Sequence, residues 1–217
     1  MVRKTRIELG TVIELQELLG VRSERIRIPD SQHIVHLQFR RFAGCPVCDL
    51  HLHSIARRHG ELLAASIREV AVFHSTVEAL LPHARQLPFT VIADPDKRLY
   101  TEFGVESAPR ALLDPRAWVP VLRGVTRSLV KVVRREQPSP ALNPHGGRFG
   151  LPADFLIASD GEVIACKYGS HAYDQWSGDE ILGLARERAI LRDDPTPCRS
   201  DEGRASTEER IQNHGRR

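Results

Sequence analysis

Short apolar runs and helical segments alternate along the first half of the chain. Residues 34–39, 68–74 and 89–93 are rich in Val, Ile and Phe, which is typical of buried strands. Residues 51–59 lie between the first two runs and are expected to form a helix, and a second helix is expected to begin at Ser75. Strands that alternate with helices predict βαβ units, and therefore an α/β protein with a largely parallel sheet flanked by helices.

Local signals mark where these helices begin and end. Ser75 is the expected N-cap of the second helix, because Glu78 follows three positions later as in a capping box. The turn at residues 94–96 leads into a short helix that is expected to stop at Gly104. Upstream of the first strand, residues 8–29 fit either an apolar hairpin or a helix followed by a strand.

The pattern changes between about residue 106 and residue 150, where a helical insertion is expected. Apolar residues recur at helical spacing from Trp118 to Val133, and basic residues occupy much of the remaining surface. A helix packed across the domain explains this segment, while a lid, a partner surface or a contact with an anionic membrane stays open. After the insertion, residues 154–158 and 163–168 predict a C-terminal β-hairpin.

Length and composition limit the classes of protein. A chain of 217 residues with 41% hydrophobic content can bury one core, so one domain is expected over residues 1–192, followed by a disordered polar tail over residues 193–217. The net charge of +3 comes from intermixed charges of both signs, which predicts no binding to nucleic acid. No apolar stretch reaches the length of a membrane span or follows the basic N-terminus as in a signal peptide. A cytoplasmic protein is therefore expected.

Two cysteines three positions apart carry the candidate chemistry. The run Cys45-Pro46-Val47-Cys48 follows the strand at residues 34–39 and opens the first helix. Unpaired N–H groups at a helix start favour a thiolate, so Cys45 is the expected nucleophile, with a lowered pKa. Cys48 lies one turn further on and is the expected resolving thiol. A strand that leads into a CxxC motif at a helix start is similar to the thioredoxin arrangement.

The same run also contains metal-ligand types. His51 and His53 follow Cys45 and Cys48, but structural zinc usually takes a second ligand pair from a separate segment, and the sequence has no second CxxC. Attachment of haem requires C-x-x-C-H, and Asp49 occupies the histidine position. Redox chemistry is preferred, with no metal or cofactor, while copper or zinc handling and inert buried thiols stay open.

Further motifs extend the comparison beyond the cysteines. They are residues 39–48, 73–75, 94–100, 103–105 and 174–176. Together these segments, within about residues 10–190, resemble the peroxiredoxin-like branch of the alkyl hydroperoxide reductase/thiol-specific antioxidant superfamily. The resemblance implies a thioredoxin-like fold with a central mixed β-sheet, an antioxidant or thiol–disulfide oxidoreductase activity, and Cys45 as the reactive cysteine. It implies a peroxide or disulfide substrate and a thioredoxin or glutathione system as reductant, and it leaves a homodimer open.

Two positions depart from the peroxiredoxin pattern. Phe42 stands where peroxiredoxins present a Thr or Ser hydroxyl, three residues before the reactive cysteine. Pro152 stands at the place of an arginine that stabilises the thiolate, so peroxide reduction needs a replacement. The candidates to replace it are Arg40, Arg41 and Arg148. The resemblance also implies that the Leu151–Pro152 peptide bond is cis and that Pro152 packs against the reactive cysteine.

The histidines near the motif and the two remaining cysteines can be explained either by a role in the chemistry or by ordinary packing and solvation. Histidines near the motif could tune the thiolate, although solvated or hydrogen-bonded bystanders are preferred. These histidines are His51, His53, His59, His74 and His171. Cys166 is expected to be a small buried hydrophobe, and Cys198 lies in the expected tail. A non-catalytic binding module that uses the basic residues 116–135 is the alternative to an enzyme.

Overall fold

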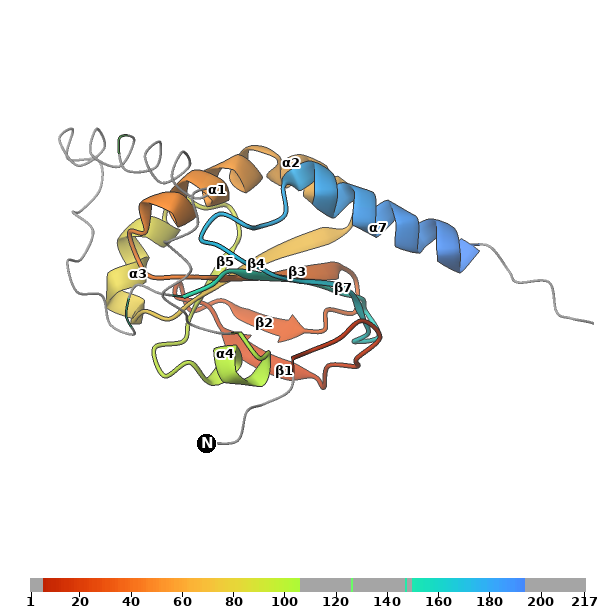
Figure 1. Cartoon of the computed structure of the whole chain (residues 1–217), viewed down its shortest axis with the longest axis horizontal. Coiled ribbons are helices and arrows are strands. Elements are labelled where there is room, and N and C mark those ends of the chain that lie inside the picture. Colours follow the sequence, from red (N-terminus) through yellow and green to blue (C-terminus); the bar gives the residue numbers. More distant parts are fainter. Residues whose placement is uncertain (1–5, 106–125, 127–146, 148–149, 194–217) are drawn as a thin grey trace, which may run out of the picture.

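A five-stranded sheet forms the centre of the protein (Figure 1). The computed structural model describes residues 6–105, Thr126, Gly147 and residues 150–193. The strands of the sheet are β3 (Ile34–Arg40), β4 (Ile67–Phe73), β5 (Thr90–Ala93), β6 (Ala153–Ile157) and β7 (Val163–Tyr168). Their order is β5-β4-β3-β6-β7.

Strand directions follow from the connections. Strands β3, β4 and β5 run parallel, because helices link them, and β6 pairs antiparallel with both β3 and β7. The βαβ units and the C-terminal hairpin predicted from the sequence are therefore confirmed, and the sheet is mixed. Strand β3 lies in the middle of this order, and all of its residues after Ile34 are buried.

Four of the described helices pack on one face of the sheet. They are α1 (Pro46–Arg57), α2 (His59–Ala64), α3 (Val77–Ala84) and α7 (Gly178–Asp193). Figure 1 shows α1, α2 and α7 along one side of the sheet, which is seen nearly edge-on. Their apolar side chains, such as Leu52, Leu80 and Ile181, share one core with Ala71 and Leu156 of the sheet. This burial, not helix propensity alone, holds the helices in place.

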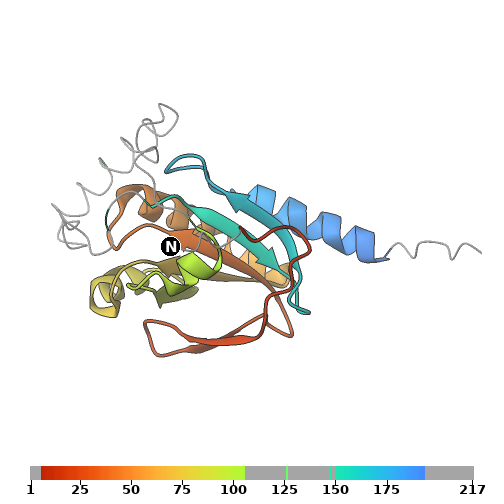
Figure 2. The same cartoon turned by 60° about the horizontal axis from the view of Figure 1, so that its bottom comes forward.

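The opposite face carries a hairpin and a short helix (Figure 2). They are β1 (Gln16–Leu19), β2 (Arg25–Ile28) and α4 (Arg98–Glu102). Strands β1 and β2 pair antiparallel, which decides the open reading of residues 8–29 in favour of a hairpin. Ile28 and Leu99 pack with Leu37 and Phe39 in the second core.

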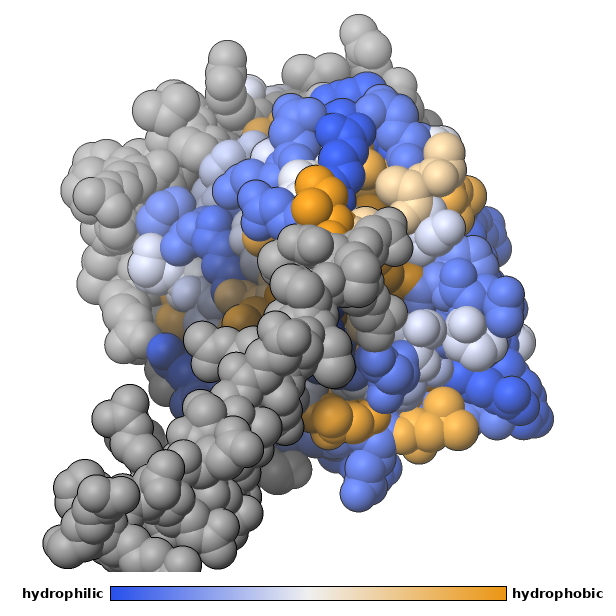
Figure 3. Space-filling view, turned by 90° about the vertical axis from the view of Figure 1, so that its right-hand side faces the viewer, coloured by the Kyte–Doolittle hydropathy of each residue, from blue (hydrophilic) through white to orange (hydrophobic). Residues whose placement is uncertain are grey.

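On the face shown in Figure 3, the described residues are mainly polar, with separate apolar spots. The exposed large apolar residues in the described ranges are Leu9, Val12, Leu15, Leu19, Leu63, Val77 and Ile190. No helix in the described part of the chain combines the length and the apolar composition that a membrane crossing needs.

Two local expectations are wrong. The N-cap of α3 is Thr76, whose Oγ1 accepts a hydrogen bond from the Ala79 N–H at 3.4 Å, and not Ser75. The Leu151–Pro152 bond was expected to be cis but is trans. Among the described residues, only the Ile28–Pro29 bond is cis. The Pro152 carbonyl accepts the Gly169 N–H at 2.9 Å, which continues the β6–β7 pairing with extended backbone.

Several expectations fall on residues that the structure does not describe. The helical insertion at residues 106–150 lies outside the described residues except for Thr126, Gly147 and Gly150. Arg148, Cys198 and the tail after residue 193 also lie outside them, and so do the basic residues of the alternative binding module, at positions 116–135. These expectations stay predictions.

Candidate active site

Cys45 caps the helix that carries Cys48. Gly44 has a φ of 74°, which lets the chain turn sharply after β3, and Cys45 then adopts an extended conformation as the N-cap of α1. Pro46 occupies the first turn, where a missing N–H costs no hydrogen bond. The Cys48 N–H points back at Cys45 Sγ at 3.3 Å. The sulfur of Cys45 thus takes the place of the usual capping oxygen.

The two thiols are close together and buried. The Cys45 and Cys48 sulfur atoms are 2.7 Å apart, and both cysteines are free. Cys45 is 1% exposed and Cys48 is 3% exposed. An intermediate on either sulfur would therefore lie within reach of the other without a movement of the backbone. This arrangement suits a dithiol–disulfide pair.

Arg41 supplies a cation at the cysteine pair. Its Nη2 donates to Cys45 Sγ at 3.1 Å, and the residue is 4% exposed. Arg40, the next candidate, points to a different group of residues, and its Nη2 donates to Asp154 Oδ1 at 2.7 Å. Arg148 is not described. Of the two candidates that the structure describes, Arg41 is therefore the one that contacts the Cys45 sulfur.

The two thiols have opposite pKa shifts. Burial raises the pKa of Cys45 well above its usual value, and the hydrogen bond with Cys48 and the charge there raise it further. Burial also acts to raise the pKa of Cys48, but the hydrogen bond with Cys45 and the charge of Arg41 outweigh burial and lower it to about 6. Sulfurs at this distance titrate as one unit, so these shifts belong to the pair and not to either cysteine alone.

The expected lowering of the Cys45 pKa is therefore wrong for Cys45 alone and applies to the pair. Sequence reasoning treated the helix start as the dominant effect, whereas burial and the adjacent Cys48 sulfur, 2.7 Å away, raise the pKa of Cys45. The donor geometry still favours Cys45, because the Arg41 guanidinium, the Cys48 N–H and the Cys48 thiol all point at its sulfur.

Residues after β4 hold the loop that contains the cysteine. The His74 N–H donates to the Arg41 carbonyl at 3.2 Å, and the Ala43 N–H donates to Ser75 Oγ at 3.0 Å. A β-carbon at Gly150 would lie 3.2 Å from His74 Nε2 and 3.3 Å from Arg41 Cγ. Sequence reasoning did not assign this role to Ser75 or Gly150, because each contact joins segments distant in the chain.

A small apolar cavity lies beside the cysteine pair. Its volume is about 20 Å³, which is room for roughly one water molecule. Its lining includes Phe42, Cys45, Cys48, Leu52, Phe73, Leu80, His83 and Val91. Phe42 therefore forms an apolar wall where the family pattern has a hydroxyl. Pro152 is the remaining predicted site residue, and it lies next to Gly169. A β-carbon added at Gly169 would lie 2.7 Å from Pro152 Cγ.

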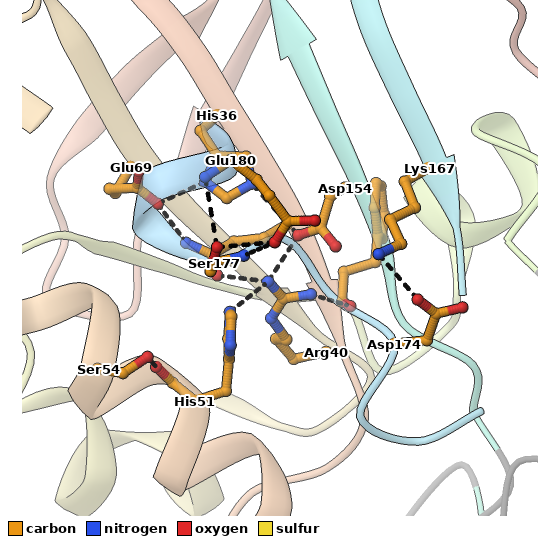
Figure 4. A network of polar contacts seen from close by, with 12 residues as sticks. His36, Arg40, His51, Ser54, Glu69, Asp154, Lys167, Asp174, Ser177 and Glu180 are labelled. Atoms are coloured by element: carbon orange, nitrogen blue, oxygen red, sulfur yellow. Dashed lines mark hydrogen bonds and ion pairs between the residues drawn. The ribbon is translucent and has the colours of Figure 1, made fainter. Parts of the chain in front are cut away.

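A buried polar network lies under α1 (Figure 4). Its members are His36, Gln38 and Arg40 of β3, Glu69 of β4, His51 of α1 and Asp154 of β6. They are joined by the contacts His36–Glu69 at 2.7 Å, Gln38–Glu69 at 2.5 Å, Arg40–Gln38 at 2.7 Å, Arg40–His51 at 3.2 Å and His36–Asp154 at 3.2 Å. The network reaches the cysteine helix through His51, one turn after Cys48.

In the buried polar network, neighbouring charges oppose the effect of burial on the pKa values of His36 and Asp154. Burial alone would lower the pKa of His36, but the carboxylates of Glu69 and Asp154 outweigh burial and raise it to about 9. Burial would raise the pKa of Asp154, yet Arg40 and His36 hold it well below its usual range. Burial and Arg40 lower the pKa of His51, which stays neutral. His36 and Arg40 are thus cations, and Glu69 and Asp154 pair with them as anions.

Comparison with known proteins decides the family. A sequence model described as AhpC/TSA antioxidant enzyme matches residues 54–171, which is more than half of the chain. The protein belongs to the AhpC/TSA antioxidant enzyme family. The match begins after Cys48 and does not cover the cysteine pair, so the chemistry of that pair is argued from the geometry above. No curated protein matches the chain.

Solved structures agree with the AhpC/TSA assignment at the level of the fold. Peroxidoxin BcpB from Mycobacterium tuberculosis is 15% identical, with a TM-score of 0.56, and the alignment covers 84% of this chain and 98% of that one. A peroxiredoxin 6 variant from Arenicola marina is 15% identical, with a TM-score of 0.61 and coverages of 86% and 76%. A PrxQ variant from Xylella fastidiosa is 11% identical, with a TM-score of 0.58 and coverages of 87% and 99%. The AhpC/TSA protein thus has the thioredoxin-like fold.

His53, Cys166 and His171 of this AhpC/TSA protein make contacts away from the cysteine pair. His53 Nε2 contacts Asp49 Oδ1 at 3.3 Å along α1, and Cys166 is half-buried in β7. His171 Nδ1 accepts the Tyr173 N–H at 3.2 Å. Within the described ranges, no three or more His, Cys, Asp or Glu side chains are grouped so that they could hold a metal ion. The geometry therefore gives no support to a metal-handling role.

Proposed function

We propose that this protein is a thiol-dependent peroxidase in which Cys45 attacks a small peroxide and Cys48 closes an intramolecular disulfide. The observation that carries the proposal is the contact of Arg41 Nη2 with Cys45 Sγ at 3.1 Å. A buried guanidinium beside the sulfur supports both the thiolate and the charge that develops on the peroxide oxygens. The family membership supports antioxidant thiol chemistry in general.

The proposed reaction proceeds in two thiol steps. The Cys45 thiolate attacks one peroxide oxygen, the O–O bond breaks, and the leaving oxygen takes up a proton as an alcohol or water. Cys45 is then a sulfenic acid. The Cys48 sulfur, 2.7 Å away in the reduced protein, attacks the Cys45 sulfur, the S–O bond breaks, and water leaves with the Cys48 proton. A cellular thiol, from a thioredoxin or glutathione system, reduces the disulfide.

Burial of the pair favours a peroxide over a disulfide as substrate. Both sulfurs are at most 3% exposed, and the cavity beside them has a volume of about 20 Å³. A small peroxide needs little more space than the water that this volume holds. A protein disulfide would need the Cys45 loop to open first. Disulfide exchange therefore stands second, although it uses the same nucleophile.

Stopped-flow mixing of the reduced protein with hydrogen peroxide, with an organic hydroperoxide and with a model disulfide tests the proposal. We expect the fastest reaction with hydrogen peroxide, its loss in Cys45→Ser, and a slowing by roughly 10²-fold or more in Arg41→Met. Cys48→Ser should still form a sulfenic acid, seen by mass after trapping, but no intramolecular disulfide. Cys166→Ser is the matched control and should react like the wild type. Peroxide turnover that survives Cys45→Ser would contradict the assignment.

A further inference from the structure

A cleft of about 440 Å³ lies beside α2, at the opposite end of the sheet from the cysteine pair. Strands β4 and β5 run parallel to β3, and the cleft lies near their amino ends, whereas the cysteines follow the carboxyl end of β3. Its volume is in the usual range of sites for small ligands. The residues of its wall that carry the argument are His59, Leu63, Glu69, Pro88, Phe89 and Thr90.

Glu69, in the wall of this cleft, has one carboxylate oxygen without a hydrogen-bond partner among the described residues. Its Oε2 contacts His36 Nδ1 at 2.7 Å and accepts from Gln38 Nε2 at 2.5 Å (Figure 4). Its Oε1 has no such contact, although the residue is 1% exposed. Buried polar atoms in folded proteins normally have a partner, so Glu69 Oε1 is a candidate binding atom for a donor that enters the cleft.

The cations of the wall are engaged with other carboxylates. Arg22 and Arg68 both line the cleft. Arg22 Nη2 lies 3.5 Å from Glu24 Oε1, and Arg68 pairs with Asp30. Neither arginine forms an ion pair with Glu69 in the described part of the chain. A donor for Glu69 Oε1 must therefore come from a bound molecule.

A second polar atom and an apolar surface lie in the same wall. His59 Nδ1 is buried and has no hydrogen-bond partner within the described ranges. The His59 ring centroid lies 6.2 Å from that of Phe89. Leu63, which is 43% exposed, and Pro88 extend this apolar surface toward solvent. The cleft thus combines an anionic acceptor, an imidazole nitrogen and an apolar wall that a short hydrocarbon chain can cover.

We propose that this cleft binds a primary amine, whose ammonium group donates a hydrogen bond to Glu69 Oε1 while its alkyl chain packs on Leu63 and Phe89. A single available oxygen suits the compact ammonium, whereas the fork of a guanidinium pairs best with both oxygens of a carboxylate. His59 Nδ1 supplies a second polar contact. A metal ion does not fit, because no third His, Cys, Asp or Glu of the described residues joins Glu69 and His59.

Titration of the full-length wild-type protein at pH 7, followed by NMR chemical shifts of backbone amides, tests the inference. Pentylammonium should shift the amides of Leu63, Glu69 and Thr90, with a dissociation constant on the order of 1 mM. Pentanol lacks the charge and pentyltrimethylammonium lacks an N–H donor, so both should bind at least about tenfold more weakly. Equal binding of the three compounds would overturn the inference. So would the absence of shifts at the cleft, which would mean that solvent alone occupies it.

The amine has two chemical sources, a free alkylamine or the lysine side chain of another protein. N-acetyl-lysine methylamide, titrated in the same way, separates them. Tighter binding of this blocked lysine than of pentylammonium would assign the cleft to a lysine side chain. Tighter binding of pentylammonium would assign it to a free amine. Either result supports donation to Glu69.

Two variants and a control connect binding to the two polar atoms. Glu69→Gln removes the charge of the acceptor and should weaken the binding of pentylammonium at least about tenfold. His59→Leu should weaken it about fivefold. Glu61→Gln is the control, because Glu61 lies on α2 and pairs with Arg58, and it should bind like the wild type. Unchanged affinity in both Glu69→Gln and His59→Leu would contradict the site. If Glu69→Gln does not fold, the wild-type ligand series and His59→Leu still decide.

Discussion

At the residue scale, single contacts from outside the CxxC motif hold Cys45 in place. Arg41 donates to its sulfur, and Ser75 accepts the N–H of Ala43, two residues before it. Ser75 and Thr76 are adjacent hydroxyl residues that bind different segments. Ser75 binds the cysteine loop, whereas Thr76 caps α3. Loss of either hydroxyl removes one hydrogen bond, but only one of the two bonds reaches the cysteine loop.

Alanine variants of Ser75 and Thr76 separate the effect of the loop hydrogen bond from that of the helix cap. Ser75→Ala leaves a backbone N–H of the cysteine loop without its acceptor, so we expect a loss of about 1–3 kcal/mol in the free energy of unfolding together with a changed rate of peroxide reaction. Thr76→Ala should cost about 1 kcal/mol through the lost cap and leave the rate unchanged. Chemical denaturation and stopped-flow kinetics measure both quantities. Equal rates for the two variants would show that Ser75 does not position the loop.

Sequence analysis could identify the cysteines but not their contacts. The CxxC motif at a strand-to-helix junction is a local signal, and the structure places Cys45 and Cys48 there. The choice between Arg40 and Arg41 has no local signal, because adjacent residues at a strand end point to opposite sides of the chain. Only the positions of α1 and β6 show which arginine reaches the sulfur and which reaches Asp154.

At the element scale, β3 has two different buried faces. Val35, Leu37 and Phe39 face the core under the hairpin and α4. The alternate residues His36 and Arg40 are equally buried but polar, and they face the helices. Sequence analysis read this run as a buried strand, which is confirmed, but a buried strand in the middle of a sheet gives no sign of which partners satisfy its polar side chains.

The charge pairing within the buried polar network predicts a large effect of one substitution. Asp154→Asn would leave the Arg40 guanidinium and the His36 imidazolium with one carboxylate fewer, so we expect a loss of roughly 3–5 kcal/mol in the free energy of unfolding. Asp179→Asn is the matched control, because Asp179 pairs with Arg58 at a side chain that is 87% exposed. It should leave the free energy of unfolding nearly unchanged. Similar urea midpoints for the two variants would contradict the role of the network.

At the scale of the whole molecule, the buried polar network joins three strands to the cysteine helix. Its contacts link β3, β4, β6 and α1, which lie far apart in the sequence. The network can therefore form only when the sheet and α1 are both in place. Its titration should appear in the stability of the entire fold and not in a local region.

His36 gives this titration a predictable sign. Its pKa is about 9 in the folded protein, above the ordinary value of 6.5, so its contribution is complete below about pH 6.5 and is lost as the pH rises through 9. In a Cys45→Ser, Cys48→Ser background, which removes the thiol titration, we expect the free energy of unfolding to fall by up to about 3 kcal/mol across this range. Adding His36→Gln should remove most of this fall. Parallel pH profiles for the two proteins would show that the imidazolium is not stabilised as described.

Local patterns in the sequence determined the main elements and pointed to the cysteine pair. Apolar runs, turn residues and the CxxC spacing act over a few positions, so the strands of the sheet, the C-terminal hairpin and the two cysteines could be predicted. Tertiary structure alone decided which arginine faces Cys45, that Ser75 holds the loop and how close the two sulfurs lie. Electrostatic energy depends on distances of a few ångströms between residues that packing brings together, and no local pattern specifies those distances.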